Sequence, residues 1–335
     1  MASGVAQIEI DLDEDRDRLR RRMGGVQYSI MRRIVQRAQR SPKRIVFPEG
    51  DNPNILRACQ ILVEEGIAQP ILLGDPEEIR RRAVEMDVHL GDKVTLIDSR
   101  TSPERQRYAD AFYELRCRKG VTRPEAARTI VRRIYFGTLM VQQGDADGIV
   151  AGLTAEYPWT IRPALEILGV RDDVKRATGM YMMFSRDQVK FFADATLNID
   201  PDAETLADTA IQVADAAQAF GVSPHIAMIS FSNFGSAPNP HSNKVAAAVA
   251  LVRAQRPDLE VDGEIQVDIA LDQRKVRELF PFSRLTESAN VLVFPSLEAG
   301  NAAYKVLAAL GGARAVGPIL LGIKKPVTVL PRDVD

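Results

Sequence analysis

Short apolar runs alternate with amphipathic segments along most of the chain. Apolar residues spaced three and four apart predict helices, whereas short unbroken apolar runs between turn residues predict strands buried on both faces. The expected strands cover residues 44–47, 69–73, 94–97, 147–152, 226–231, 259–267, 291–294 and 315–321. The expected helices cover residues 26–40, 53–65, 75–84, 103–119, 124–142, 243–254 and 299–310. Strands that alternate with helices indicate an α/β fold with parallel sheets.

The number of these elements indicates two sheet-containing domains with a cleft between them. A chain of 335 residues is long enough for two domains of ordinary size. In folds of this class, ligands bind beside the carboxyl ends of the strands. We therefore expect functional residues in the loops that directly follow strands.

Composition and charge exclude several classes of protein. The 44 Lys and Arg residues nearly balance the 45 Asp and Glu residues, and the net charge of -1 gives no sign of nucleic-acid binding. The apolar runs are far too short to cross a bilayer, and the N-terminus has no apolar leader. Two cysteines are too few for a disulfide framework. We expect a cytoplasmic protein that binds neither nucleic acid nor membrane, with residues 1–24 as a charged linker.

The loop at residues 230–238 carries the richest set of small and polar residues. Its members leave backbone N–H groups accessible, and they include Ser232, Asn233, Gly235 and Ser236. Lys244 in the following helix adds a positive charge, and the start of a helix favours anions, so the loop suits a phosphate or carboxylate. The alternative is a turn whose Ser and Asn side chains only cap the helix.

Other polar residues follow strands or lie near them. Asn301 either hydrogen-bonds a polar ligand or caps a helix. Arg116 and Arg162 each either hold a phosphate through a planar guanidinium or form a surface ion pair. A basic cluster beyond the last strand consists of Lys324, Lys325 and Arg332.

A metal site is not expected. The carboxylates of Asp262, Glu264 and Asp268 fall on one side of an expected strand, where a divalent ion could bind. Ion pairing or capping is enough to explain three carboxylates near a strand end. The three histidines are scattered without the spacing of metal ligands.

Six short motifs lie at residues 44–50, 113–120, 160–165, 230–236, 262–268 and 317–327. In this order they resemble the phosphate acetyltransferase (phosphotransacetylase) family over about residues 27–335. More narrowly, residues 232–235, the helix at 31–33 and the charged arm at 1–24 resemble the C-terminal module of large bacterial NADP-dependent malic enzymes.

The resemblance implies two parallel-sheet α/β domains of the phosphotransacetylase and isopropylmalate-dehydrogenase type, with the second inserted in the first. Residues 25–171 and 315–335 would form the first domain and residues 172–314 the second, with acetyl-CoA in the cleft between them. A dimer is expected, and NADP and a divalent metal are expected only in an upstream malic enzyme unit. The candidate residues for binding acetyl-CoA or phosphate are Arg116, Thr154, Arg162, Ser232, Asn233, Gly235, Ser236, Lys244, Asn301, Lys325 and Arg332.

The family's catalytic pattern is only partly matched near the C-terminus. Pro331 replaces a serine hydroxyl, Arg332 is kept, and the chain ends at Asp335 before the family's catalytic aspartate. Losing a general base costs about 10²–10⁴-fold in rate. We therefore expect no catalytic residue, and a regulatory module that binds acetyl-CoA without turnover and controls the oxidative decarboxylation of malate. The alternatives are an active phosphate acetyltransferase and a purely structural dimerisation domain.

Overall fold

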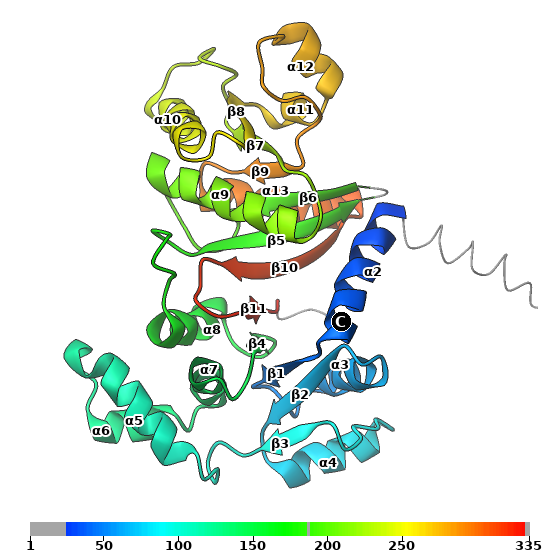
Figure 1. Cartoon of the computed structure of the whole chain (residues 1–335), viewed down its shortest axis with the longest axis vertical. Coiled ribbons are helices and arrows are strands. Elements are labelled where there is room, and N and C mark those ends of the chain that lie inside the picture. The colour runs from blue at the N-terminus through cyan, green and yellow to red at the C-terminus, as the bar shows by residue number, and fades with distance from the viewer. Residues whose placement is uncertain (1–24, 186–187, 332–335) are drawn as a thin grey trace, which may run out of the picture.

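Eleven strands form one continuous sheet along the long axis of the molecule in this computed structural model, which describes residues 25–185 and 188–331 (Figure 1). Their order across the sheet is β3-β2-β1-β4-β11-β10-β5-β6-β9-β7-β8. In chain order the strands are β1 (Lys43–Phe47), β2 (Ala68–Leu73), β3 (Thr95–Ile97), β4 (Gly148–Ala151), β5 (Thr178–Ser185), β6 (Gln188–Ala193), β7 (His225–Ile229), β8 (Glu260–Ile265), β9 (Val291–Val293), β10 (Arg314–Leu321) and β11 (Val327–Val329).

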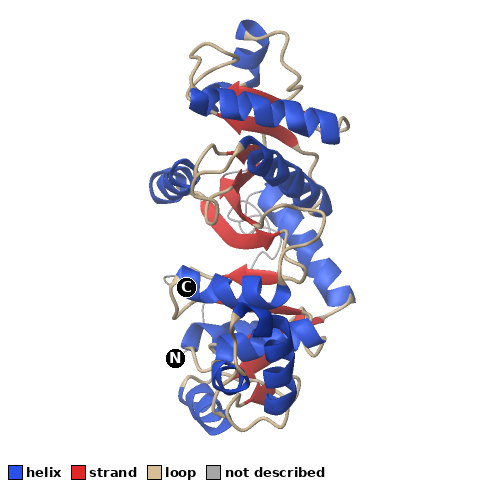
Figure 2. Ribbon diagram, turned by 90° about the vertical axis from the view of Figure 1, so that its left-hand side faces the viewer, coloured by secondary structure: helices blue, strands red, loops and turns tan. Residues whose placement is uncertain are grey.

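Helices lie on either side of the strands (Figure 2). In chain order they are α2 (Gly25–Arg40), α3 (Pro53–Glu64), α4 (Pro76–Glu85), α5 (Arg105–Arg116), α6 (Arg123–Thr129), α7 (Arg133–Gln143), α8 (Tyr157–Pro163), α9 (Ala203–Ala219), α10 (Pro240–Gln255), α11 (Val267–Ala270), α12 (Gln273–Leu279) and α13 (Leu297–Gly311). A 3-10 turn at Cys117–Lys119 follows α5, and a π-helical turn at Ala164–Leu168 follows α8. None of the helices described is both long and apolar enough to cross a membrane.

The predicted α/β fold class is confirmed, because helices alternate with strands and seven of the ten strand pairings are parallel. The prediction of parallel strands throughout is wrong in the middle of the sheet. There β10 runs antiparallel to both β5 and β11, and β5 runs antiparallel to β6. Strands that follow one another with a short connection must pair antiparallel, since a parallel pair needs a long crossover. The described strands also form one sheet and not two separate ones.

The division of the chain into two domains stays a prediction. β10 crosses the expected boundary at residue 315 and pairs with β5 on one side and with β11 on the other. Its pairing with β11 has the single register pair Ile319 and Thr328. A short pairing of this kind joins the two halves of the sheet through few ladder hydrogen bonds.

The described hydrophobic core divides into clusters according to the two faces of the sheet. On β5, Met180 and Met182 pack in a cluster with α9 and α10, whereas Tyr181 and Met183 pack on the other face with α13. β1 and β2 divide their side chains in the same way between α5–α7 and α3–α4. Both faces of the sheet are therefore buried, which explains the unbroken apolar strands, since successive side chains point to opposite faces.

Several elements differ from the predicted ones. The sequence pattern predicted neither β5 and β6 nor α9. The helix expected at residues 124–142 is two helices, because Arg132 takes an extended conformation between α6 and α7 and Ile130 is buried beside it. The strand expected at 259–267 ends at Ile265, and α11 begins two residues later.

Candidate functional site

The loop after β4 lies where the tail of the chain returns to the sheet. β11 pairs parallel with β4, and the Leu330 N–H donates to the Ala151 carbonyl oxygen at 2.7 Å. Gly152 follows with a φ of 122°, and a Cβ at this position would lie 2.7 Å from the Leu330 carbonyl oxygen. Only glycine fits this close approach of two backbones. The loop that precedes α8 is therefore held against the end of β11.

Two predicted arginines converge on one carboxylate beside this loop. Arg162 lies on α8, and its Nε donates to Glu166 at 2.8 Å. Arg116, at the end of α5, reaches the same Glu166 oxygen at 3.4 Å. The Tyr135 hydroxyl of α7 donates to the second oxygen of Glu166 at 2.9 Å. Helices that are distant in the sequence thus place two guanidinium groups around one acidic side chain.

The electrostatics of this cluster favour an anion. Burial opposes ionisation of Glu166, but hydrogen bonds from Arg162 and Tyr135 outweigh it, so the pKa of Glu166 is lowered. Burial and the bond to Glu166 raise the pKa of Tyr135 to about 12, and the phenol stays neutral at physiological pH. Two guanidinium groups against one carboxylate leave a net positive charge. The Arg162 side chain is 64% exposed and can turn toward a ligand, whereas the Arg116 side chain is mostly buried.

Buried polar atoms without a hydrogen-bond partner among the described residues gather around α8. They include Oε2 of Glu49, Nε of Arg116 and Oγ1 of Thr160. The other oxygen of Glu49 accepts the Gly152 N–H at 2.9 Å, which places this carboxylate at the base of the loop. Buried polar groups are almost always paired, so unpaired ones mark a place where a bound molecule or water completes the bonding. We call this place the β4 site, made of Glu49, Arg116, Tyr157, Arg162 and Glu166.

Sequence reasoning missed three members of the β4 site. Glu49 is a charged residue in the turn directly after a buried strand, which is a usable signal. Glu166 lies four residues after Arg162, the spacing at which helical side chains pair. Tyr157 had no signal, because its partners come from distant segments. Its hydroxyl lies near Thr196, Asp194 and Tyr304, and burial raises its pKa.

The serine-rich loop after β7 turns its donors inward to a buried carboxylate. The Ser232 hydroxyl and the Gly235 N–H both donate to Oε1 of Glu264, at 2.9 and 2.6 Å. The Ser236 hydroxyl accepts the Asn233 N–H at 2.9 Å. Glu264 therefore already occupies the place in this loop where an anion was expected. The predicted role of these residues in ligand binding stays a prediction.

The alternative prediction is that Ser and Asn side chains of the loop at 230–238 cap the following helix, but another residue caps it. Asn239 caps α10 through its side chain, one residue before the helix begins. Similarly, Ser296 caps α13 by accepting the Ala299 N–H, and Asn301 instead donates to the Ala195 carbonyl oxygen at 3.2 Å.

Lys244 lines a separate pocket of about 430 Å³ at the carboxyl ends of β6, β7 and β9. Its Nζ donates to Asp200 at 2.7 Å and to the Pro295 carbonyl oxygen at 3.2 Å. Phe231 and Ser296 contribute to the walls. We call this space the β7 pocket, made of Ile199, Asp200, Phe231, His241, Lys244, Pro295, Ser296 and Glu298.

One segment runs from the β4 site to the β7 pocket. It begins after β6, where the Asp194 carboxylate accepts the backbone N–H groups of Thr196, Leu197 and Asn198 and fixes the turn. Thr196 lies beside Tyr157 of the β4 site, and Asp200 binds Lys244 of the β7 pocket. Four residues span at most roughly 14 Å. The two places are therefore close enough for one extended ligand.

The remaining predicted residues lie apart. Thr154 is exposed in the loop before α8. Lys325 precedes β11 and so lies at the opposite end of that strand from the β4 site. Arg332 lies outside the described residues.

The carboxylates considered for metal binding have separate partners. Asp262 pairs with Arg253, Glu264 binds the serine loop, and Asp268 pairs with Lys275. No group of His, Cys, Asp and Glu suited to a metal occurs within residues 25–185 and 188–331.

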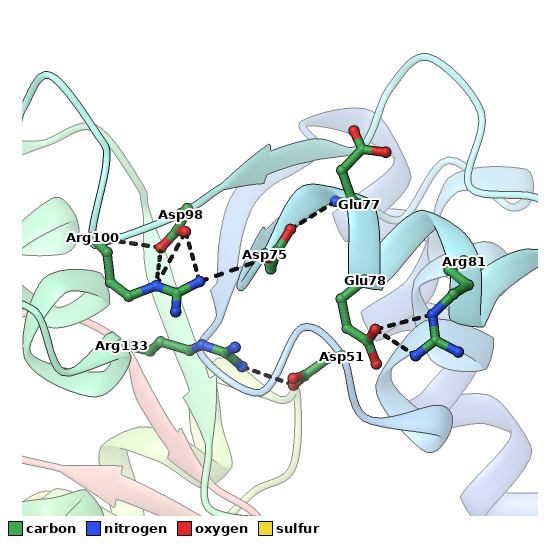
Figure 3. A network of polar contacts seen from close by, with 8 residues as sticks. All are labelled: Asp51, Asp75, Glu77, Glu78, Arg81, Asp98, Arg100 and Arg133. Atoms are coloured by element: carbon green, nitrogen blue, oxygen red, sulfur yellow. Dashed lines mark hydrogen bonds and ion pairs between the residues drawn. The ribbon is translucent and has the colours of Figure 1, made fainter.

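The carboxyl ends of β1, β2 and β3 are closed by ion pairs (Figure 3). Arg133 binds Asp51 at 2.8 Å, and Arg100 binds Asp98 at 2.9 Å. These strand ends offer no unpaired charge comparable to the cluster after β4.

The fold places the chain in the class of α/β proteins whose sheets are mostly parallel, and such proteins commonly bind ligands beside the carboxyl ends of their strands. Comparison with known proteins makes this specific. The chain belongs to the phosphate acetyl/butaryl transferase family, which matches residues 29–335.

Individual relatives match over nearly their whole length. A phosphate acetyltransferase from Thermoanaerobacterium thermosaccharolyticum is 40% identical over 91% of this chain and 94% of its own. One from Bacillus subtilis is 40% identical over 87% of this chain and 90% of its own. The crystal structure of a phosphotransacetylase from Streptococcus pyogenes superposes with a TM-score of 0.87 at 35% identity, over 92% of this chain and 93% of that chain.

These comparisons correct the predicted function. The interpretation as a regulatory module of an NADP-dependent malic enzyme, an oxidoreductase, is wrong, because the relatives that match almost end to end are phosphate acetyltransferases. The short motifs lie within this fold and carry no information about another domain, so they could not identify a malic enzyme. The expected lack of turnover rested on one general base, whereas positioning and electrostatic stabilisation usually contribute more to the rate.

Proposed function

We propose that this protein transfers an acetyl group between coenzyme A and inorganic phosphate. A phosphate oxygen attacks the thioester carbonyl carbon, the carbon–sulfur bond breaks, and the thiolate leaves and takes up a proton. The products are acetyl phosphate and coenzyme A. Both substrates are anions, so cations that hold them together provide most of what the reaction needs.

The observation that carries this proposal is the convergence of Arg116 and Arg162 on Glu166. Guanidinium groups bind phosphate through paired hydrogen bonds, and two of them side by side offset repulsion between the two anionic substrates. Arg162 would release one bond to Glu166 and turn to the phosphate. Arg116 has a buried Nε without a partner in the described structure, so it can donate to a ligand.

The second substrate fits the path from the β4 site to the β7 pocket. The thioester end of acetyl-CoA would lie near Tyr157, and its extended arm would follow the segment from Thr196 to Asp200. The exposed ring of Phe231 and the Lys244 side chain in the β7 pocket suit an aromatic base and its phosphates. Asn301 lies along this path through its bond to Ala195.

Glu166, which holds both arginines, is not free to act as the general base. Glu166 accepts three hydrogen bonds, and its lowered pKa makes it a poor proton acceptor. In the direction of acetyl phosphate formation the nucleophile is already an anion. We therefore assign Arg116 and Arg162 to binding and charge stabilisation.

The experiment is to measure turnover in both directions with the purified chain. We expect acetyl phosphate to form from acetyl-CoA only when phosphate is present, and acetyl-CoA to form from acetyl phosphate and coenzyme A. Coenzyme A release that does not depend on phosphate would indicate a hydrolase and contradict the proposal. The expected dimer stays a prediction, which the molar mass in solution would test.

A further inference from the structure

A second pocket lies between α9 and the turn that joins β10 to β11. Its volume is about 480 Å³. Ala216 and Ala219 of α9 form one wall, and Ile319 and Leu321 of β10 form another. Three cationic side chains complete the lining: Arg171, Lys324 and Lys325. Apolar walls with several cations suit a small organic anion better than water or a neutral ligand.

The cations of this pocket are available to an incoming anion. Lys325 has no ion-pair partner among the residues that the structure describes. Arg171 binds Asp173 at 3.0 Å and Lys324 binds Asp172 at 2.9 Å, but these aspartates are 67% and 92% exposed. Exposed ion pairs contribute little energy, so a ligand can replace them at small cost.

The one acid that lines the pocket already has an ion-pair partner. Asp215 pairs with Arg256 at 2.8 Å, and that guanidinium also binds Asp258. The pocket therefore keeps a positive balance of charge from its own lining residues.

A buried amide oxygen at the pocket points to a hydrogen-bond donor on the ligand. Gln212 of α9 lines the pocket and is only 5% exposed. Its Nε2 donates to the Arg176 carbonyl oxygen at 3.0 Å, while its Oε1 has no donor among the described residues. Unpaired buried acceptors are rare in proteins. This oxygen lies against the backbone at Gly322, so a hydroxyl group on the bound molecule would reach it once the side chain turns away from that glycine.

This pocket is distinct from the β4 site. Lys325 precedes β11, whereas Val329 at the other end of the strand pairs with Ala151 of β4. The four residue steps from Lys325 to Val329 span roughly 13 Å at about 3.3 Å per step. The pocket also touches both halves of the sheet, because α9 packs in one core cluster while Ile323 and Val327 belong to another.

We propose that this pocket binds a small hydroxylated organic anion at a second site, separate from acetyl transfer. Arg171, Lys324 and Lys325 would hold its carboxylate or phosphate groups, and Gln212 would accept a hydrogen bond from its hydroxyl. The assignment gives Lys325 a different ligand from the acetyl-CoA expected from the sequence.

Calorimetric titration of the whole chain tests this proposal, with citrate and 3-phosphoglycerate as probes. We expect at least one probe to bind with a millimolar dissociation constant. The double variant Arg171→Gln, Lys324→Gln should bind it about tenfold more weakly, since two exposed charge contacts are lost. The matched double variant Arg57→Gln, Arg128→Gln removes the same charge from exposed helix positions elsewhere and should bind like the wild type.

The variant Gln212→Met tests the hydroxyl contact separately. It removes the unpaired oxygen while keeping the volume, and it also removes the Nε2 bond to the Arg176 carbonyl oxygen. We expect about threefold to tenfold weaker binding of the same probe. Thermal unfolding checks that each variant is folded. The absence of heat from both probes at millimolar concentration, or wild-type affinity in the Arg171 and Lys324 double variant, would overturn the second site. Neither result depends on whether the chain transfers acetyl groups.

Discussion

Glu166 sets the position of both arginines at the β4 site. Its two oxygens accept hydrogen bonds from Arg162, Arg116 and Tyr135, which come from three different helices. The carboxylate thereby holds two guanidinium groups near one another and balances the charge of only one of them. In the proposed function, this single residue preorganises an exposed arginine and a buried one for an anion.

Replacing Glu166 with Gln should destabilise the protein in a pH-dependent way. Because the folded-state pKa of Glu166 is lowered from 4.5, its ionised form stabilises the fold above that pH, and the contribution is lost as the pH falls through the folded-state pKa. We expect the free energy of unfolding of the variant to be about 1–2 kcal/mol lower than that of the wild type at neutral pH. This difference should become smaller below pH 4.5. Urea unfolding at several pH values measures it, with the exposed Glu114→Gln variant as control. A difference that grows toward low pH would contradict this assignment.

Replacing Arg162 with Ala should impair catalysis and not stability. The Arg162 side chain is largely exposed, so its loss leaves the fold intact, but the phosphate loses a charged donor. We expect kcat/KM for phosphate to fall about 10²–10³-fold. Steady-state kinetics measure this, and Arg128→Ala on the exposed face of α6 should stay near the wild-type value. An equal fall of kcat/KM in the two variants would indicate a general charge effect and would show that Arg162 does not bind the phosphate.

Among the elements, α9 positions the segment that connects the β4 site with the β7 pocket. The helix begins directly after that segment, and Asp202 caps it by accepting the Thr205 N–H at 2.7 Å. Buried small residues such as Ala207, Ala210 and Ala214 let α9 pack closely on the sheet. Its alanines leave no apolar stripe of large residues, which explains why the sequence pattern did not predict it.

Replacing Asp202 with Ala should destabilise α9 through loss of its cap. The expected cost is about 1 kcal/mol, since the start of the helix loses the acceptor for the Thr205 N–H. Chemical denaturation measures the change, and Asp92→Ala in an exposed loop serves as the matched control. An unchanged free energy of unfolding would mean that water replaces the cap without cost.

The sequence predicted most strands and helices, because burial on both faces leaves unbroken apolar runs such as 291–294. It could not predict that β10 reverses direction, since antiparallel and parallel strands of a buried sheet look alike in sequence. At the β4 site it proposed Arg116 and Arg162 because of their charge, although both lie on helices and not in loops. It could not find Tyr157, whose contacts with Thr196 and Tyr304 depend on how the segments fold together.

At the scale of the whole molecule, the two halves of the sheet meet at the narrow pairing of β10 with β11. If the halves are separate domains, each should be able to unfold locally while the other stays folded. Replacing Leu139 with Ala in the core of the β1–β4 half should cost about 2–5 kcal/mol. We expect faster hydrogen exchange in α7 and β4 and unchanged protection in α10 and β8. Uniformly faster exchange would show one cooperative unit instead of two domains.

The most direct test of this account is phosphate-dependent coenzyme A release from acetyl-CoA, measured for the wild type and for the Arg116→Ala, Arg162→Ala double variant. We expect turnover that saturates with phosphate in the wild type and a loss of at least about 10²-fold in the double variant. Wild-type turnover in the double variant, or none in the wild type, would contradict it.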